Sequence, residues 1–257
     1  MELSQYIRTT ETLTVAGKVV EDVLKNVPEP KCFFVLITHE STHLANFFEE
    51  GNSLRVPFGL VMMEVSAGGP DANVTLTQLS RVAAEARRVR QVSWCATVVV
   101  VSDDLAFLAA FAQWSLKGRL LVWSTRLLVV TRLPLHHLQV LRELLSVTNS
   151  MLLVVENDSK SQRCSVYIQL PFSPREAQAL KVASWTPHSG FALTSSLPFF
   201  PDKFSRLLNG PKFVVVAEEF EPHIAMVKVE DKRSTSLSFK GPLVNLLEIL
   251  ASTMNFS

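Results

Sequence analysis

The chain has 257 residues, of which 47% are hydrophobic and 19% charged, and its formal net charge is +1. This composition is typical of a globular protein with a large core, in one large or two unequal domains. A net charge so close to zero gives no general attraction to nucleic acid or anionic lipid, so we expect neither as a partner. The most apolar stretch, Leu116–Leu133, is interrupted by lysine and arginine and is unsuited to crossing a bilayer.

The first part of the chain alternates apolar strand-like runs with stretches of helical periodicity. In chain order the patterns predict a helix over Thr12–Asn26, a strand over Cys32–Thr38, a helix over His43–Glu50, a strand over Phe58–Val65, a helix over Thr75–Gln91, a strand over Ala96–Ser102, a helix over Leu105–Leu116 and a strand over Arg119–Ser124. Strands this continuously apolar are buried on both faces, as in parallel sheets covered by helices.

The alternation continues with a helix over Pro134–Val147, a strand over Met151–Asn157, an antiparallel partner over Cys164–Leu170 and a proline-punctuated surface connection over Pro171–Pro201. We therefore predict a doubly wound α/β domain with a mostly parallel sheet and flanking helices. We place its end at residue 205 and assign residues 206–257 to a second, incomplete domain.

The second domain has its own order of elements. Its patterns predict a strand over Phe213–Ala217, a bend at Pro222, a strand over Ile224–Val229, a polar segment over Glu230–Ser236 and an amphipathic helix from Leu243 to Phe256. Pro242 suits the first turn of that helix, because the N–H that proline lacks would have no intrahelical acceptor there. Strand, bend, strand and helix in this order are expected at the start of one lobe of a two-lobed α/β clamp.

Three patterns could carry chemistry. His39-Glu40-Ser41-Thr42-His43 satisfies the H-E-x-x-H zinc motif, which requires a helix, but His39 directly follows a predicted strand. A polar loop is the interpretation we favour, with a zinc hydrolase as the alternative. Ser102-Asp103-Asp104 follows another strand, where open α/β sheets place ligands, although capping of the next helix by Ser102 or Asp103 explains it more simply.

The third pattern, Gly68-Gly69-Pro70, lacks the glycine spacing of a nucleotide-binding turn, and we expect no cofactor. The cysteines Cys32, Cys95 and Cys164 are widely spaced and odd in number, and each borders a strand-like run. We therefore favour buried free thiols, with one disulfide pair in an extracellular setting as the alternative. Asn73 and Asn157 lie in N-x-S/T sequons in loop-like contexts and are candidate glycosylation sites; a further sequon lies at Asn255.

The segments FPDKFSRLLNGPKFVVVAEEFEPH (200–223) and FKGPLVNLLEILASTMNFS (239–257) resemble the start of the ligand-binding domain of ionotropic glutamate receptors, and most closely the variant ionotropic receptors of arthropods. The resemblance covers about sixty residues, and residues before it resemble the variable amino-terminal region of such receptors more loosely. It implies the extracellular part of a ligand-gated cation channel in the plasma membrane, with other receptor subunits as partners, a small-molecule ligand and no enzymatic activity. It also implies that the chain is part of a longer protein.

In that family the bend after the first strand contributes a glutamate and, after a proline, an aromatic residue to the ligand pocket. Here Pro222 matches, His223 occupies the place of the aromatic residue and Phe220 that of the glutamate, which Glu219 and Glu221 flank. The resemblance thus gives Glu219, Pro222 and His223 as ligand-binding candidates without identifying the ligand. A plain binding module with the architecture of periplasmic binding proteins is the remaining alternative.

Overall fold

The computed structural model describes residues 17–26, 32–39, 59–65, 72–92, 95–122, 125–158, 161–174, 177–205, 207, 210–231 and 234–257. The chain divides into two units, which are described separately: unit 1 consists of residues 1–169 and 178–201, and unit 2 of residues 170–177 and 202–257. The predicted helix over His43–Glu50 lies outside the described residues.

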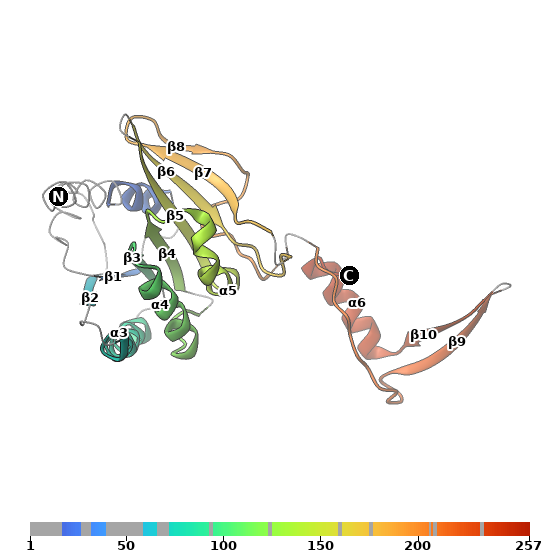
Figure 1. The fold of residues 1–257 in the computed structure, drawn as a ribbon. Coiled ribbons are helices and arrows are strands. Elements are labelled where there is room, and N and C mark those ends of the chain that lie inside the picture. The colour runs from blue at the N-terminus through green and yellow to red at the C-terminus, as the bar shows by residue number, and fades with distance from the viewer. Residues whose placement is uncertain are drawn as a thin grey trace, which may run out of the picture. The chain divides into compact units, whose positions relative to one another are not determined.

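Unit 1 is built on an eight-stranded sheet of order β2-β1-β3-β4-β5-β6-β7-β8 (Figure 1). The strands are β1 (Phe33–His39), β2 (Leu60–Val65), β3 (Ala96–Val101), β4 (Thr125–Thr131), β5 (Asn149–Asp158), β6 (Ser161–Ile168), β7 (Leu180–Thr186) and β8 (Gly190–Leu193). The pairs from β2 to β5 are parallel and those from β5 to β8 antiparallel. The predicted α/β class with a mostly parallel sheet is confirmed.

Both faces of the parallel part are buried, as the apolar runs predict. One face carries Val35, Ile37 and Val98, which pack in one core with α3 (Ala72–Val92), α4 (Leu105–Lys117), the 3-10 helix η1 (Leu135–Leu141) and α5 (Arg142–Val147). The alternate side chains, such as Phe34 and Leu36, point to the opposite face and are equally buried. Helical residues 17–25 are joined to β7 by a hydrogen bond of 2.8 Å from Trp185 Nε1 to Asp22 Oδ2.

The strand order creates a switch point in the sheet. β1 lies between β2 and β3, so the chain leaves β1 toward one edge and returns past it to continue toward the other. In open α/β sheets the connections diverge at such a point, and the carboxyl ends of the two central strands border a crevice. In unit 1 these strands are β1 and β3.

The predicted fourth strand, Arg119–Ser124, is wrong: β4 begins at Thr125. Residues 119–122 instead close α4, because Leu120 N donates to Ser115 O and the Leu120 side chain is buried beneath the helix. The following run, with its β-branched pair Val129 and Val130, supplies the strand that continues the parallel sheet.

The predicted surface connection Pro171–Pro201 is also wrong, since it contains β7 and β8. β7 pairs with the edge that β6 would otherwise leave open, and its side chains Val182, Ala183 and Trp185 are buried. The prolines near the ends of this segment obscure a short alternating strand pattern in between.

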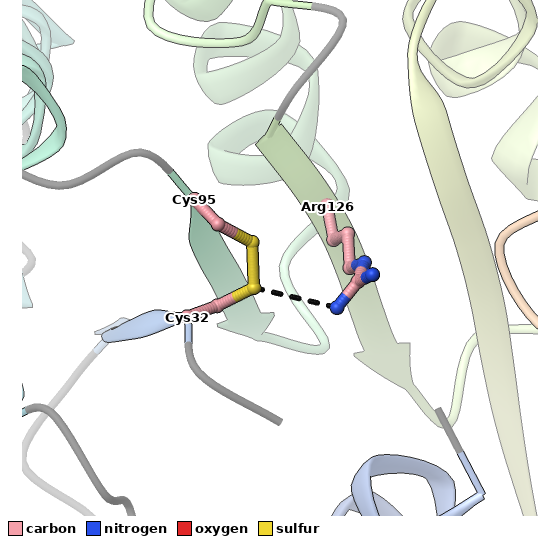
Figure 2. The surroundings of a disulfide bond; sticks show 3 residues. All are labelled: Cys32, Cys95 and Arg126. Atoms are coloured by element: carbon pink, nitrogen blue, oxygen red, sulfur yellow. Dashed lines mark hydrogen bonds between the residues drawn. A yellow bond between two sulfur atoms is a disulfide. The ribbon is translucent and has the colours of Figure 1, made fainter. Parts of the chain in front are cut away.

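The favoured expectation of free thiols is wrong for two of the three cysteines, and the alternative of one closed pair is the arrangement found. Cys32 and Cys95 form a disulfide (Figure 2), with Cα atoms 4.6 Å apart. They precede Phe33 and Ala96, which are register partners in adjacent strands, so the sheet itself brings the two cysteines together. A guanidinium nitrogen of Arg126 lies 3.3 Å from Cys32 Sγ. Cys164 is free and buried, and desolvation raises the pKa of its thiol to about 12.

Unit 2 contains an antiparallel hairpin, β9 (Ala225–Asp231) and β10 (Ser234–Lys240), followed by α6 (Pro242–Met254). The final helix is thus confirmed, with Pro242 in its first turn. The described residues of the predicted polar segment Glu230–Ser236, namely 230–231 and 234–236, belong instead to β9 and β10. The predicted strand Phe213–Ala217 is absent: this segment has no strand partner among the described residues, and Val214 and Val216 are 95% and 93% exposed.

Within the described residues, no helix combines the length and apolar content that a bilayer span requires.

Candidate functional site

The carboxyl edge of the sheet at the switch point gathers polar residues from three strands. His39 is the last residue of β1, Asp103 and Asp104 follow β3, and Thr131 and Arg132 stand at the end of β4. Parallel strands of similar register end together, so residues far apart in sequence meet here.

Asp104 is the N-cap of α4. Its Oδ1 accepts hydrogen bonds from the backbone N–H groups of Ala106 (2.8 Å) and Phe107 (3.3 Å), which would otherwise lack acceptors in the first turn. Ser102 supports the cap, because its Oγ accepts from Asp104 N at 3.0 Å. Capping is therefore confirmed, but the capping residue is Asp104 and not Ser102 or Asp103.

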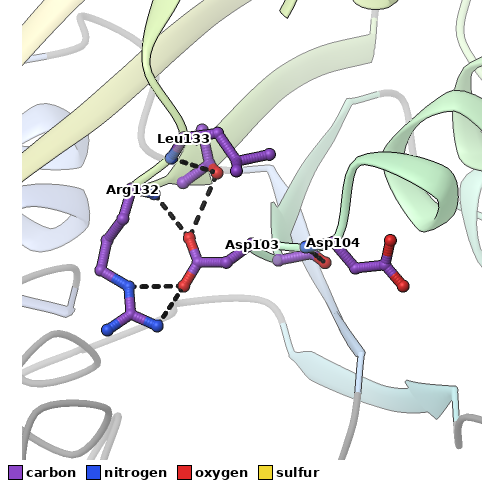
Figure 3. A network of polar contacts seen from close by, with 6 residues as sticks. Asp103, Asp104, Arg132 and Leu133 are labelled. Atoms are coloured by element: carbon purple, nitrogen blue, oxygen red, sulfur yellow. Dashed lines mark hydrogen bonds and ion pairs between the residues drawn. The ribbon is translucent and has the colours of Figure 1, made fainter. Parts of the chain in front are cut away.

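Asp103 ties the loop after β3 to the loop after β4 (Figure 3). Its Oδ1 accepts from Arg132 N at 2.6 Å and from Thr131 Oγ1 at 3.2 Å, and its Oδ2 receives the guanidinium of Arg132. Thr131 Oγ1 in turn accepts from Leu133 N at 3.1 Å. Both oxygens of Asp103 are thus engaged within the protein, and this carboxylate positions the loops.

His39 lies against the first turn of α4. Its ring stacks on Phe107 with a centroid distance of 4.6 Å and an interplanar angle of 21°. Its Nδ1 is 3.8 Å from Asp104 Oδ2, beyond direct hydrogen bonding. The side chain of Asp104 is 43% exposed at this edge, whereas that of His39 is only 9% exposed and Phe107 is buried. The accessible carboxylate oxygen can accept a hydrogen bond from a hydroxyl or an amine of a small molecule.

The zinc alternative fails at its first residue. His39 ends a strand, as the sequence indicates, whereas H-E-x-x-H requires both histidines on one helix. Glu40 and His43 lie outside the described residues. In the part of the chain that the structure describes, no group of three or more histidine, cysteine or acidic residues could hold a metal ion.

Sequence reasoning missed Arg132 as the partner of Asp103. A fourth strand over Arg119–Ser124 ends well before Arg132, so this prediction leaves Arg132 only as one of the basic residues that interrupt the apolar stretch Leu116–Leu133. The signal that could have found it is its position directly after the β-branched run that ends at Thr131, which is where a parallel strand delivers its next residue to the carboxyl edge.

The three ligand-binding candidates of unit 2 lie in one tight bend. Phe220 N donates to Ile224 O at 2.9 Å, which closes a turn containing a cis Glu221–Pro222 peptide. Glu219 Oε1 accepts from Met226 N at 3.0 Å, so this carboxylate ties the bend to β9. The ring of His223 stacks on Phe220 at 5.4 Å. The bend brings Glu219, Pro222 and His223 together on an exposed turn.

The sequons lie in different contexts from those expected. Asn73 is in the first turn of α3 and Asn157 is in β5, so the loop-like interpretation of both is wrong. Asn255 follows α6 in a left-handed conformation, and its Nδ2 donates to Leu207 O at 2.6 Å. The Asn255 amide therefore has a structural role.

Comparison with known proteins finds no matching family model and no matching curated protein. Among solved structures, the chain is similar to GanP, a glucose-galactose binding protein from Geobacillus stearothermophilus, with 13% identity over 57% of this chain and 47% of that chain and a TM-score of 0.35. It is also similar to a probable maltose operon transcriptional repressor, MalR, from Staphylococcus aureus, with 11% identity over 56% of this chain and 47% of that chain and a TM-score of 0.36. The match thus spans about half the length of each, and similarities this distant assign neither a family nor a ligand.

Proposed function

We propose that the chain is the extracellular part of a ligand-gated cation channel subunit of the ionotropic glutamate receptor family, resembling the variant receptors of arthropods. Unit 1 would be an α/β amino-terminal region and unit 2 the opening elements of the ligand-binding clamp. In this family closure of the clamp around a ligand opens the channel, so the ligand acts by favouring one state.

The observation that carries the proposal is the pairing of the two motif segments within unit 2. Leu207 N donates to Met254 O at 2.8 Å, and Phe213 N donates to Ser257 O at 2.7 Å. The ring of Phe213 also meets that of Phe256 edge to face at 5.1 Å. Residues of the first segment thus lie against the N-F-S end of the second, which gives a physical reason for both to occur in one chain.

Local contacts also explain the aspartate and the lysine of the P-D-K-F segment. Asp202 Oδ1 accepts from the backbone N–H groups of Phe204 and Ser205, each at 3.0 Å, and hydrogen bonds from Ser205 and Phe204 lower the pKa of this carboxyl. Lys203 is buried, and desolvation lowers the pKa of its amine to about 7. The aspartate shapes a turn and the lysine is held in the interior, so P-D-K-F specifies a structure rather than a solvated linker.

The exposed apolar face of α6 is consistent with the proposal that unit 2 is only part of a lobe. No α6 residue is buried, although Leu246, Ile249 and Leu250 repeat at helical spacing and are 50%, 61% and 41% exposed. An amphipathic helix is stabilised mainly by covering its apolar face, and that cover is expected from further elements of the clamp.

The disulfide supports an extracellular setting. Disulfides persist in oxidising compartments and are rare in the cytosol, and Cys32–Cys95 is formed between adjacent strands of the main sheet. A plasma-membrane parent protein, partner subunits and the absence of enzymatic activity remain parts of the proposal that rest on the resemblance.

The test is the reading frame that follows Ser257 in the parent gene and the behaviour of its product. We expect the remainder of the clamp, three membrane spans and a pore segment, and a ligand-evoked cation current when the full subunit is expressed at a cell surface with candidate partner subunits. A stop codon directly after Ser257, or a full product without any membrane span, would overturn the proposal.

A second candidate, a plain small-molecule-binding module, is favoured by the switch-point edge with His39, Asp104 and Phe107. If it holds, Asp104→Asn, which retains the helix cap, will weaken binding of a polar small molecule to the chain alone. The receptor proposal instead expects no saturable binding of glutamate or glycine at millimolar concentration, because the second lobe that completes the pocket is absent. Calorimetry on this chain and on the variant separates the two.

A further inference from the structure

A groove of about 360 Å³ lies between α3 and the end of α4. Its principal lining residues are Ala83, Ala84, Arg87, Arg88, Gln91 and Trp114. The α3 residues recur at helical spacing, so they form one continuous wall, and Trp114 forms the opposite wall. The volume lies in the range of small-molecule sites, roughly 300–1,000 Å³.

Small residues open this groove. Ala83 and Ala84 provide little side-chain volume where α3 faces α4, and Gly118 at the end of α4 also lines the groove. A Cβ added at Gly118 would lie 3.0 Å from Trp114 O and 3.8 Å from the Cβ of Ala83. Gly118 therefore allows the end of α4 to pack closely against α3, and the small side chains of Ala83 and Ala84 leave the space beside the Trp114 indole.

The charged residues of the two helices that border the groove are mostly positive. α3 carries Arg81, Arg87, Arg88 and Arg90 against the single acid Glu85, and the only charged residue of α4 is Lys117. Lys117 Nζ lies 5.8 Å from the centre of the Trp114 ring. The whole chain has a net charge of only +1, so positive charge is concentrated here.

Complementing the helix dipoles explains only part of this charge. Arg90 and Lys117 lie in the last turns of their helices, where cations interact favourably with the C-terminal end. Arg87 and Arg88 precede the last turn of α3, so the helix dipole does not explain them, and both line the groove. Arg88 pairs with Glu85 at 3.0 Å, but its side chain is 77% exposed and such surface pairs contribute little. Arg87 has no ion-pair or hydrogen-bond partner among the described residues.

We propose that this groove binds a small organic anion with an apolar body. Its carboxylate would lie between the guanidinium groups of Arg87 and Arg88, which suit a planar carboxylate, and its apolar body would pack against Trp114, Ala83 and Ala84. The helices run opposite to the strands, so the groove near their C-terminal ends lies away from the carboxyl edge that holds His39 and Asp104. The inference is independent of the receptor proposal and concerns a different ligand site.

The test is titration of the chain with 2-naphthoate by calorimetry, with uncharged 2-naphthamide as the matched ligand. We expect one site per chain for naphthoate and at least tenfold weaker binding of the amide. Arg87→Gln with Arg88→Gln should weaken naphthoate binding at least tenfold, and Ala84→Phe, which fills the groove without changing charge, should abolish it. Arg81→Gln, on the same helix but outside the groove, should change the affinity less than twofold.

Thermal melting of every variant checks that the fold is retained, and Ala84→Leu replaces the phenylalanine variant if that one does not fold. The inference is overturned if the amide binds as tightly as the acid, if Arg81→Gln weakens binding as much as the double variant, or if naphthoate does not bind. Heparin binding that survives Ala84→Phe while naphthoate fails to bind would identify the charge as a polyanion surface instead.

Discussion

The amide of Asn255 donates a 2.6 Å hydrogen bond to the carbonyl of Leu207, 48 residues earlier in the chain. Asn255 adopts a left-handed conformation (φ 60°) that ends α6, and its backbone N–H bonds to Ala251 O. One residue thus terminates the helix and attaches its end to the segment that precedes the hairpin. Asparagine suits both tasks, because it tolerates this conformation better than most residues and carries a side-chain donor.

The first prediction separates these two tasks. Asn255→Gly keeps the left-handed conformation and loses the amide, which we expect to cost about 1 kcal/mol locally, whereas Asn255→Ala also adds about 1 kcal/mol of backbone strain. Hydrogen exchange of the peptide covering residues 250–257 should accelerate in the order wild type, glycine variant, alanine variant. Ser252→Ala, an exposed position in the same helix, is the control and should not accelerate exchange. Equal exchange in the wild type and both Asn255 variants would show that the hydrogen bond from the Asn255 side chain to Leu207 O does not stabilise the end of the helix.

The second prediction concerns thiol reactivity. With Cys32 and Cys95 paired and Cys164 buried, a thiol reagent should find no reactive group in the native chain, one in urea, and three in urea after reduction. Since burial, and secondarily the charge of Glu156, raises the pKa of Cys164 from 9.0 to about 12, native reactivity should stay flat from pH 7 to 9.

The raised pKa of Cys164 also makes the stability of the fold depend on pH. Between pH 9 and 12 the unfolded chain releases the Cys164 proton while the folded chain retains it, so stability should fall as pH rises through this window. Cys164→Ala is the control and should reduce this pH dependence. A native thiol that reacts at the rate of a free cysteine would contradict the buried position.

The third prediction concerns the stability contributed by the disulfide. It joins residues separated by 63 positions, so Cys32→Ser with Cys95→Ser should destabilise unit 1 by roughly 2–4 kcal/mol, because the unfolded chain regains loop entropy. Urea unfolding measures the loss, and reduction of the wild type should reproduce it. Peptide mapping without reductant should recover the linked pair, and its absence from secreted protein would refute the pairing.

The fourth prediction concerns the cap of α4. Asp104→Ala removes the acceptor for two backbone N–H groups and should cost about 1 kcal/mol in urea unfolding. Asp104→Asn keeps an acceptor oxygen and should cost only a few tenths of a kcal/mol. Equal losses for both variants would indicate that the negative charge of Asp104, and not its hydrogen bonds, stabilises the edge.

The fifth prediction concerns the apolar face of α6. Because Leu246 and Ile249 are at least half exposed, the isolated chain should bind an apolar dye and self-associate at tens of micromolar. Replacing both by lysine should reduce dye binding and shift sedimentation toward the monomer, whereas Glu248→Gln on the same helix should do neither. Unchanged association in the double variant would place the sticky surface elsewhere.

The α/β class and most elements of unit 1 can be predicted from local sequence patterns. Runs such as Ala96–Val101 are too continuously apolar and β-branched to be stable anywhere but in a covered sheet, and the helices between them have one apolar side. The position of His39 at the end of a strand, and not within a helix, is likewise predicted by the continuous apolar run that precedes it. Local composition is sufficient where burial and periodicity agree.

The contacts between these elements depend on which strands are neighbours in the folded sheet. The Cys32–Cys95 pair depends on β1 and β3 being neighbours in register, and the Asp103–Arg132 pair on β3 and β4 ending at the same edge. The strand Leu180–Thr186 is stable because it pairs with β6, whereas the equally strand-like Phe213–Ala217 has no strand partner among the described residues and is exposed. Backbone pairing between distant segments is a property of the assembled sheet, so no local pattern could distinguish these two runs.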